Sequence, residues 1–237
     1  MPIFSPRPAI RAIPIDDTHD CLVVDNALVE PERWLAHAVA QGDAFRANPR
    51  YAYPGAELPM PDDFAGALDD FFRVHVRTRL GGRRTIGMTT RMAMVTQPPH
   101  ALQPRQWMCH RDSQHIEPGE CIAASVLYLF RDERLGGTSI YRPRLGERET
   151  ARIVHDSSTM DAATFTRIHG VTAGYITDSN AWFERVLTVP PAFNRMVFYD
   201  GSLFHAAHLT HPELLSNDPA TGRLTINGFF RCTRQLR

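Results

Sequence analysis

The sequence has no surplus of charge of either sign, since 26 lysines and arginines balance 26 aspartates and glutamates over 237 residues. A basic surplus would indicate a nucleic-acid partner and an acidic tail a solvating segment, so this balance argues against both. No segment approaches the roughly 18 apolar residues that a membrane span needs. The opening residues, MPIFSPRPAIRAIPIDD, carry prolines and charges where a signal peptide needs an unbroken apolar run. We therefore expect a cytoplasmic protein with neither membrane nor nucleic acid as a partner.

Cysteine is scarce, and the four cysteines form no CxxC pair: Cys21, Cys109, Cys121 and Cys232. Without a secretion signal they are expected to be reduced thiols. Their scatter excludes a cysteine-rich zinc module, and a glycine-rich phosphate loop is also lacking. No internal repeat or low-complexity tract divides the chain. With 43% apolar residues, the chain can bury a sizeable core, and we interpret residues 1–237 as a single domain. The sequence does not predict an oligomeric state.

The first part of the chain, residues 1–82, is expected to be an N-terminal arm, a strand and a helical layer. Apolar residues at helical spacing predict one helix from Pro31 to about Gln41 and another from Pro61 to Leu80, ended by Gly81-Gly82. The segment YAYPGAELPMP between them is predicted to be a loop, because of its Pro-Gly punctuation.

The second part, residues 83–237, changes to short β-rich segments separated by turn residues, which is typical of a sandwich or barrel. These segments are RTIGMTTRMAMVTQ, QWMCH, CIAASVLYLF, TSIYRP, FERVLTV, NRMVFYD, LFHAAH and RLTINGFFRC. A helix-bearing insertion is expected near residues 157–170. The predicted fold is mainly β with N-terminal helices (α+β), in which helices pack on one sheet of an antiparallel sandwich.

The stretch QWMCHRDSQHIEPGE concentrates Cys109, His110, Asp112 and His115. In an extended chain, residues i and i+2 point to the same side, so His110 and Asp112 can converge while Cys109 faces away as a wall residue. His115 lies beyond a predicted turn. Taken alone, so short a motif also fits a surface histidine beside a solvated aspartate.

A non-haem Fe(II) site of two histidines and one carboxylate would need a second histidine from a distant strand. The candidates are His205, His208 and His211, which follow the predicted strand NRMVFYD. A carboxylate-bearing cosubstrate would also need a fixed cation. Arg223 and Thr225 face the same side of the predicted strand RLTINGFF and could hold one carboxylate, although a strand cap and an ordinary strand threonine fit as well.

Four segments, in this order, resemble the 2-oxoglutarate- and Fe(II)-dependent oxygenases with a double-stranded β-helix (jelly-roll) core, and their prolyl-hydroxylase-like branch in particular. They are HRD, ASVLYLFRDERLGGTSIYRP, FNRMVFYDGSLFHAA and GRLTINGFF. The N-terminal LVVDNALVEPERWLAHAVA resembles the strand and helix that precede this core. The resemblance covers about residues 20–235, and the YAYPG loop points to a bacterial subfamily.

This resemblance implies that His110, Asp112 and His205 are the catalytic iron ligands. His205 follows the DGSL turn where the family has its distal histidine. A carboxylate at Asp112 favours hydroxylation, because related halogenases replace it with a small residue. The implied cofactors are Fe(II), the cosubstrate 2-oxoglutarate and O2. The implied reaction is hydroxylation of an unactivated C–H bond, with release of succinate and CO2.

The resemblance further implies that Arg223 binds the far carboxylate of 2-oxoglutarate, with hydrogen bonds from Thr225 and Tyr128. His205 and Arg223 are 18 residues apart, which is more than is common in the family, so HLTHPELLSNDPATG is expected to be an inserted loop. The substrate could be a small molecule or an amino-acid or protein side chain. Expected lining residues are Trp107, Gln114, Arg142 and Trp182.

Two alternatives remain open from the sequence. A cupin-like metalloenzyme that does not use 2-oxoglutarate would keep the metal but would not need an Arg-x-Thr anchor. A non-catalytic β-sandwich that serves as an interaction module would bind neither metal nor cosubstrate.

Overall fold

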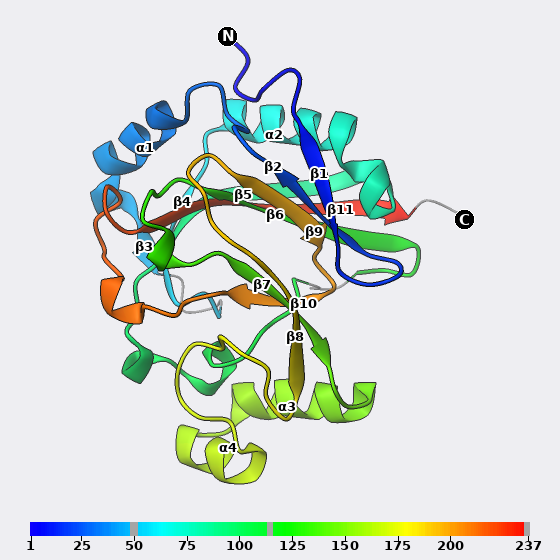
Figure 1. The fold of residues 1–237 in the computed structure, drawn as a ribbon, viewed down its shortest axis with the longest axis vertical. Helices are drawn as coiled ribbons and strands as arrows, with labels where there is room; N and C mark the ends of the chain where they lie inside the picture. The colour runs from blue at the N-terminus through cyan, green and yellow to red at the C-terminus, as the bar shows by residue number, and fades with distance from the viewer. Residues whose placement is uncertain (48–51, 113–115, 235–237) are drawn as a thin grey trace.

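The computed structural model describes residues 1–47, 52–112 and 116–234. Its large sheet contains β1 (Ile10–Pro14), β2 (Asp20–Val24), β3 (Arg46–Ala47), β4 (Gly55–Pro59), β5 (Gly82–Val95), β6 (Glu120–Tyr128), β9 (Met196–Asp200) and β11 (Arg223–Arg234). A smaller sheet contains β7 (Thr138–Pro143), β8 (Phe183–Val189) and β10 (Phe204–Ala207). All pairings are antiparallel, in the orders β1-β2-β9-β6-β11-β5-β4-β3 and β10-β7-β8 (Figure 1).

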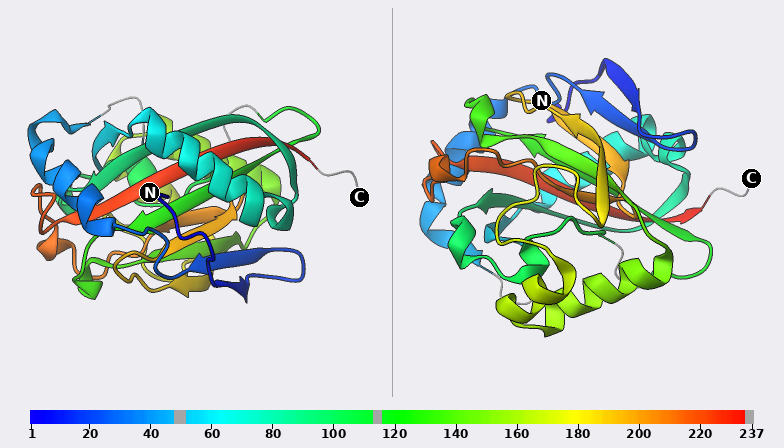
Figure 2. Two further views of the ribbon diagram at one scale, coloured as in Figure 1. Left: turned by 90° about the horizontal axis from the view of Figure 1, so that it is seen from above. Right: turned by 60° about the horizontal axis from the view of Figure 1, so that its bottom comes forward.

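Four α-helices occur in the described residues: α1 (Pro31–Ala40), α2 (Asp62–His75), α3 (Glu147–Thr159) and α4 (Ala162–His169). Helices α1 and α2 lie on the outer face of the large sheet, whereas α3 and α4 lie beyond the small sheet (Figure 2). The chain is therefore stacked as helices, large sheet, small sheet and helices. None of the described helices is both long and apolar enough to cross a bilayer.

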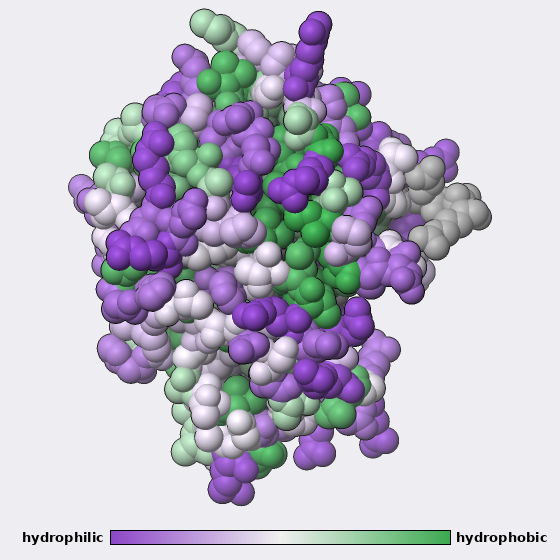
Figure 3. Space-filling view, in the orientation of Figure 1, coloured by the Kyte–Doolittle hydropathy of each residue, from purple (hydrophilic) through white to green (hydrophobic). Residues whose placement is uncertain are grey.

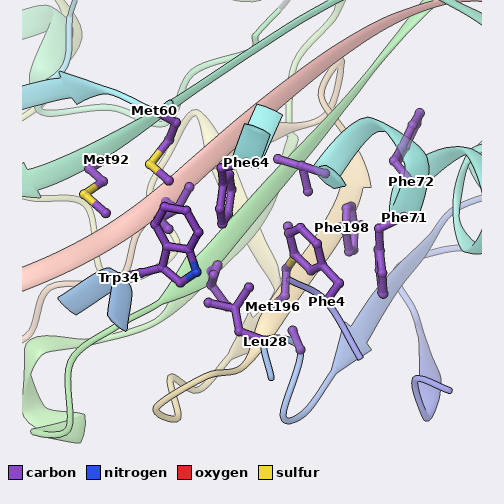
Figure 4. Packing of buried hydrophobic residues seen from close by; sticks show 14 of the residues in the cluster. Phe4, Leu28, Trp34, Met60, Phe64, Phe71, Phe72, Met92, Met196 and Phe198 are labelled. Carbon is purple, nitrogen blue, oxygen red and sulfur yellow. The ribbon is translucent and has the colours of Figure 1, made fainter. Parts of the chain in front are cut away.

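The main core fills the space between the large sheet and helices α1 and α2. The ring of Phe72, fully buried on α2, stacks on Phe230 of β11 at a centroid distance of 3.9 Å. Trp34 of α1 meets Phe64 of α2 edge-on at 4.6 Å, and Phe4 of the N-terminal arm closes over Phe64 at 5.4 Å (Figure 4). Helical apolar spacing thus covers one complete face of the sheet.

The opposite face of the large sheet faces the small sheet, and strand alternation decides which side chains reach it. On β11, Leu224, Ile226 and Phe230 belong to the helix-covered core. The intervening residues of β11 line a cavity between the layers: Arg223, Thr225, Asn227, Phe229 and Arg231. From β6 onward the chain passes back and forth between the sheets: β6, β9 and β11 are in the large sheet, whereas the consecutive β7 and β8, and then β10, are in the small one.

Three sequence predictions differ from this fold. The segment predicted as a loop contains β4, which pairs with β5, and Gly55 permits the contact because an added Cβ would lie 1.8 Å from the Met94 oxygen. QWMCH forms only an isolated bridge at His110. The helical insertion begins at Glu147 rather than near residue 157. The sequence did not predict this start, because α3 is polar and lacks an apolar stripe.

Figure 3 shows an apolar strip on the molecular face over the region of β1, β2 and β9. A cluster between the two sheets includes Val23, Ala124, Tyr128, Ile140, Val189 and Val197, with Ile13, Val186 and Leu203 packed partly buried against it. This cluster packs the inner faces of the two sheets against each other, next to the cavity.

Candidate active site

The two central histidines face each other across a two-residue bridge. The His110 N–H donates to the His205 carbonyl at 2.9 Å, and the His205 N–H donates to the His110 carbonyl at 2.8 Å. Residues directly opposite in an antiparallel pair present their side chains on the same side, and the two rings lie 4.4 Å apart between centroids. Although they are far apart in the sequence, the backbone makes them neighbours.

Asp112 completes the group, as the two-residue spacing predicts. Its N–H donates to the Gly201 carbonyl at 2.8 Å, which fixes the chain beside the turn that leads to β10. One carboxylate oxygen lies 3.7 Å from His110 Nε2, and the other lies 3.3 Å from His205 Nε2. One ligand atom from each of the three side chains falls within 4.8 Å of the others.

The orientation of the His205 ring is set from behind. Its Nδ1 donates to the Leu203 carbonyl at 2.9 Å, so Nε2 is the nitrogen that faces Asp112 and carries the free lone pair when the ring is neutral. Asp112 Oδ2 is buried and has no hydrogen-bond partner among the described residues. A buried acceptor of this kind is costly unless something binds it, and a cation would do so.

The three groups shift one another's protonation. Desolvation inside the cavity, where the His110 side chain is nevertheless half accessible, and the neighbouring His205 lower the pKa of His110 to about 4, despite the charge of Asp112. Burial also opposes charge on His205, but Asp112 and the Leu203 carbonyl outweigh it and raise the pKa of His205. For Asp112, burial favours the neutral acid, yet His205, His110 and Arg91 prevail and lower its pKa. Asp112 is therefore anionic near neutral pH.

Arg223 is a buried cation, 3% exposed, at the start of β11. Its Nε donates to the carbonyls of Leu135 and Gly136 at 3.0 and 3.1 Å, and its Nη2 donates to the Gly137 carbonyl at 2.8 Å. No described carboxylate forms an ion pair with it, and the segments outside the described residues carry no aspartate or glutamate. Burial lowers the pKa of Arg223, opposed by the hydroxyls of Tyr53, Tyr128, Tyr175 and Tyr199.

Thr225 and Tyr128 lie next to Arg223 as opposed residues of β11 and β6. The Thr225 hydroxyl donates to the Ala93 carbonyl at 3.2 Å and lines the cavity. The Tyr128 hydroxyl shares a hydrogen bond of 2.8 Å with Thr138 Oγ1, and Thr138 rather than Tyr128 reaches the cavity. Burial raises the pKa of Tyr128 to about 12, so its hydroxyl keeps its proton.

Sequence reasoning missed three tyrosines that line the same cavity. Tyr199 lies on β9, with its ring 4.7 Å from that of His205. The Tyr175 hydroxyl donates to the Gln97 carbonyl at 2.6 Å, and the buried Tyr53 hydroxyl has no hydrogen-bond partner in the described structure. Only Tyr199 had a usable signal, because it alternates with Phe198 on a predicted strand.

His110, Asp112 and His205, which we call the metal-competent group, line one cavity of about 1460 Å³ together with Arg223. Its walls come from the inner face of the large sheet, from β10 and from α3, and the molecular outline is indented on that side (Figure 3). The cavity-facing ring of His110 remains half exposed, with 54% of its side chain accessible. The cavity is large enough for a cosubstrate and a substrate together.

Other sequence-predicted residues lie elsewhere. His208 Nδ1 forms a hydrogen bond of 3.1 Å with Ser139 Oγ, and His211 Nδ1 one of 3.0 Å with Glu213 Oε1. Neither histidine belongs to the metal-competent group. The indole N–H groups of Trp107 and Trp182 donate to backbone carbonyls, and neither these tryptophans nor Arg142 lines the cavity. Cys109 is buried and lines the wall, as expected. His115 and Gln114 fall outside the described residues.

Comparisons with solved structures give similarities over most of the chain. A prolyl-4-hydroxylase from Pseudomonas putida is 17% identical, with a TM-score of 0.44 over 94% of this chain and 97% of that one. HygX from Streptomyces hygroscopicus, solved with nickel, 2-oxoglutarate and hygromycin B, is 10% identical, with a TM-score of 0.49 over 93% and 85%. An N-substituted L-amino acid dioxygenase from Burkholderia ambifaria is 11% identical, with a TM-score of 0.40 over 91% and 86%. At TM-scores below 0.5, no function is inferred from these similarities.

The sequence comparisons are narrower. No curated protein matches the chain. A profile for a family described as of unknown function (DUF6445) matches residues 6–230.

Proposed function

The chain belongs to a family of unknown function (DUF6445), and from its site we propose that it is a non-haem Fe(II)- and 2-oxoglutarate-dependent oxygenase that hydroxylates an unactivated C–H bond. The observation that carries the proposal is one cavity that contains both a His-Asp-His group and a buried guanidinium to which no described carboxylate is paired. Either feature alone would also fit a purely structural role. Together they match the needs of a metal and of a dicarboxylate cosubstrate.

The three side chains fit a divalent iron ion. Two imidazoles and a carboxylate on one side of a cavity are the donor set of non-haem Fe(II) oxygenases, with other positions left open. The hydrogen bond from His205 Nδ1 to the Leu203 carbonyl supports ligation through Nε2. The unpartnered Asp112 Oδ2 is the acceptor that such an ion would satisfy.

Arg223 fits the far carboxylate of 2-oxoglutarate. Three backbone carbonyls already hold its Nε and Nη2, so the fork is fixed before the ligand arrives. Preorganised donors lose little entropy on binding. Thr225 would add a hydroxyl, and Tyr128 would act through Thr138, which it holds at 2.8 Å.

Bound iron would supply oxidative chemistry in which O2 is the oxidant: one oxygen atom enters succinate as 2-oxoglutarate loses CO2, and the other converts a substrate C–H bond to C–OH. The protein contributes positioning. Arg223 orients the cosubstrate along the cavity toward the histidines, while Asp112 and His205 hold each other in ligating orientation. Tyr199, whose ring lies 4.7 Å from that of His205 and which lines the same cavity, would exclude water between the two subsites.

The repeated passage of the chain between two antiparallel sheets supports the more specific proposal that the core is a double-stranded β-helix, or jelly roll. In such a core, segments far apart in the sequence become neighbours, as residues 110 and 205 do here. A single domain over residues 1–237 agrees with the continuous large sheet, which contains both the first and the last strand.

The proposal is tested by adding Fe(II) and 2-oxoglutarate to the metal-free protein under anaerobic conditions. We expect a weak visible charge-transfer band that Asp112→Ala and His205→Ala abolish. Arg223→Leu should raise the 2-oxoglutarate concentration for half-saturation at least about tenfold, because a charge-assisted pair is lost. His208→Gln, a histidine variant outside the group, is the matched control and should keep the band.

The same titration separates the alternatives. A cupin-like metalloenzyme would hold the metal and be indifferent to Arg223→Leu, and an interaction module would hold no metal. Full-strength absorbance in Asp112→Ala would refute the ligand assignment. Succinate formation with a pool of metabolites then searches for the substrate.

A further inference from the structure

The cavity continues beyond the metal-competent group along the inner face of β5 and β11. There Phe229 lies between two arginines, Arg91 and Arg231. The Arg91 guanidinium carbon is 4.6 Å from the Phe229 ring centroid, which is cation–π range. Arg231 stands opposite Gly87, whose missing side chain leaves room over the strand. We call Arg91, Phe229 and Arg231 the arginine floor.

Both arginines of this floor lie near carboxylates that are outside the cavity lining. Glu57 on β4 approaches Arg91 Nε at 2.5 Å, and Glu120 approaches Arg231 Nε at 3.8 Å. These contacts use the inner nitrogen of each guanidinium. The short contact positions the Arg91 side chain, whereas Glu120 is a nearby charge beside the half-exposed Arg231; neither adds a carboxylate to the cavity wall.

The charge of the whole cavity is positive. Its described lining contains five arginines, Arg91, Arg105, Arg111, Arg223 and Arg231, and two carboxylates, Asp112 and Glu147. Glu57 and Glu120 behind the floor raise the acidic total to four against five.

The charges of the proposed metal and cosubstrate site cancel one another, so that site does not neutralise the positive surplus of the cavity. The charges of Fe(II) and Arg223 are balanced by Asp112 and the two carboxylates of 2-oxoglutarate. Four arginines then remain against Glu147 in the lining, or against three glutamates with those behind the floor. A cavity with a positive surplus in low-dielectric walls attracts an anionic ligand.

The floor is also close enough to the chemistry to matter. Arg91 and Arg231 line the same cavity as the metal-competent group. On the other side, Arg111 directly follows His110, with its guanidinium carbon 4.2 Å from the Phe204 ring centroid. A ligand held on the floor would therefore lie beside the metal position.

We propose that the arginine floor binds the substrate through an oxyanion, a carboxylate or a phosphate, while Phe229 packs against the adjoining apolar part. This inference rests on the proposed function and names the substrate class for it. Arginine suits the task because its planar fork recognises both oxyanions, and Phe229 favours an apolar group next to the charge.

The test uses three probes with the same phenyl group: 3-phenylpropionate, phenyl phosphate and the neutral 3-phenylpropanamide. Binding is measured by isothermal titration calorimetry on anaerobic protein saturated with Fe(II) and 2-oxoglutarate, so that Arg223 is already occupied. We expect at least one anion to bind about tenfold or more tightly than the amide. The better of the two anions distinguishes a carboxylate from a phosphate substrate.

Two variants assign the preference to the floor. Arg231→Gln, and the double variant Arg91→Gln/Glu57→Gln that leaves no buried carboxylate unpaired, should reduce the preference to about threefold or less. Arg84→Gln is the matched control, because Arg84 is exposed on the same strand β5 and does not line the cavity.

Equal binding of the three probes, no detectable binding of either anion, or a preference that survives both floor variants would overturn the inference. The charge-transfer band is recorded first on each sample. A missing band refutes the proposed function, whereas a normal band without anion preference refutes only the substrate class.

Discussion

The hydrogen bond from His205 Nδ1 to the Leu203 carbonyl decides how the metal-competent group behaves before any ion binds. It leaves Nε2 beside Asp112, so a proton on that nitrogen is stabilised by the carboxylate. Among the described residues no backbone carbonyl holds the His110 ring in this way, and the ring is half exposed to the cavity. Two histidines that bridge each other through the backbone are thus chemically unequal.

Metal binding should therefore release about one proton near neutral pH rather than two. Because its pKa is raised, His205 keeps its second ring proton to a higher pH than an ordinary histidine, and the ion must displace that proton. His110, with a pKa of about 4, is already neutral. Apparent affinity should consequently rise with pH through the pKa of His205. Calorimetric titration of Zn(II) in buffers of different ionisation enthalpy counts the protons, and a value near zero or two would contradict the unequal pair.

Gly201→Ala should weaken metal binding about tenfold, as loss of support around a ligand commonly does. An added Cβ would lie 3.3 Å from Asp112 Cβ and 3.4 Å from Oδ2, so the carboxylate must move. Gly66→Ala, in α2 with open space around it, should leave metal affinity unchanged and stabilise the fold by about 0.5–1 kcal/mol. Calorimetry with Zn(II) and urea unfolding measure both effects, and equal affinity in the two variants would count against the packing argument.

At the scale of elements, the segment between the short 3-10 helix η5 (Glu133–Leu135) and β7 holds the side chain of Arg223 in place. Its carbonyls at Leu135, Gly136 and Gly137 receive the Arg223 guanidinium. The two glycines are required by space, because a Cβ would lie 1.8 Å from the His208 oxygen at Gly136 and 1.9 Å from the Val189 oxygen at Gly137. The Gly-Gly-Thr sequence therefore permits close backbone packing and also orients the buried guanidinium of Arg223.

Helices α3 and α4 are joined by a buried pair, His169 Nε2 to Asp156 Oδ2 at 2.9 Å. His169→Ala should cost about 1–3 kcal/mol, because Asp156 is left without its buried partner. Asp156→Asn keeps an oxygen acceptor and should cost less. Urea unfolding gives the loss, and faster hydrogen exchange within α3 locates it. Equal stability of His169→Ala and the unaltered protein would show that the pair is dispensable.

Across the whole molecule, the large sheet separates two tasks by its two faces. One face packs against α1 and α2 and supplies stability, and the other holds the cavity. A substitution on the helix side should therefore alter stability without altering the metal-binding group.

Phe72→Ala should destabilise the protein by about 3–5 kcal/mol, because a fully buried ring stacked on Phe230 is removed. Under conditions where the variant remains folded, its Zn(II) affinity should stay within about twofold of the original. Val74→Ala, 63% exposed on the same helix, serves as the control and should change stability by no more than about 0.5 kcal/mol. A large loss of metal affinity in folded Phe72→Ala would refute the separation.

The sequence by itself determined the features that depend on local periodicity. Helical spacing predicted α1 and α2, and two-residue alternation predicted that His110 faces with Asp112 and Arg223 with Thr225. Local patterns failed where tertiary contacts decide. Strand β4 looks like a loop until it pairs with β5, and α3 has too few apolar residues to reveal itself.

Only the tertiary structure decided which distant residues meet. It placed His205 rather than His208 opposite His110, surrounded Arg223 with carbonyls and tyrosines, and set the arginine floor beside the chemistry. The physical reason is that periodicity specifies which face of a strand a side chain occupies. The pairing of strands far apart in the chain, with the burial and electric field that follow, exists only after the two sheets have packed together.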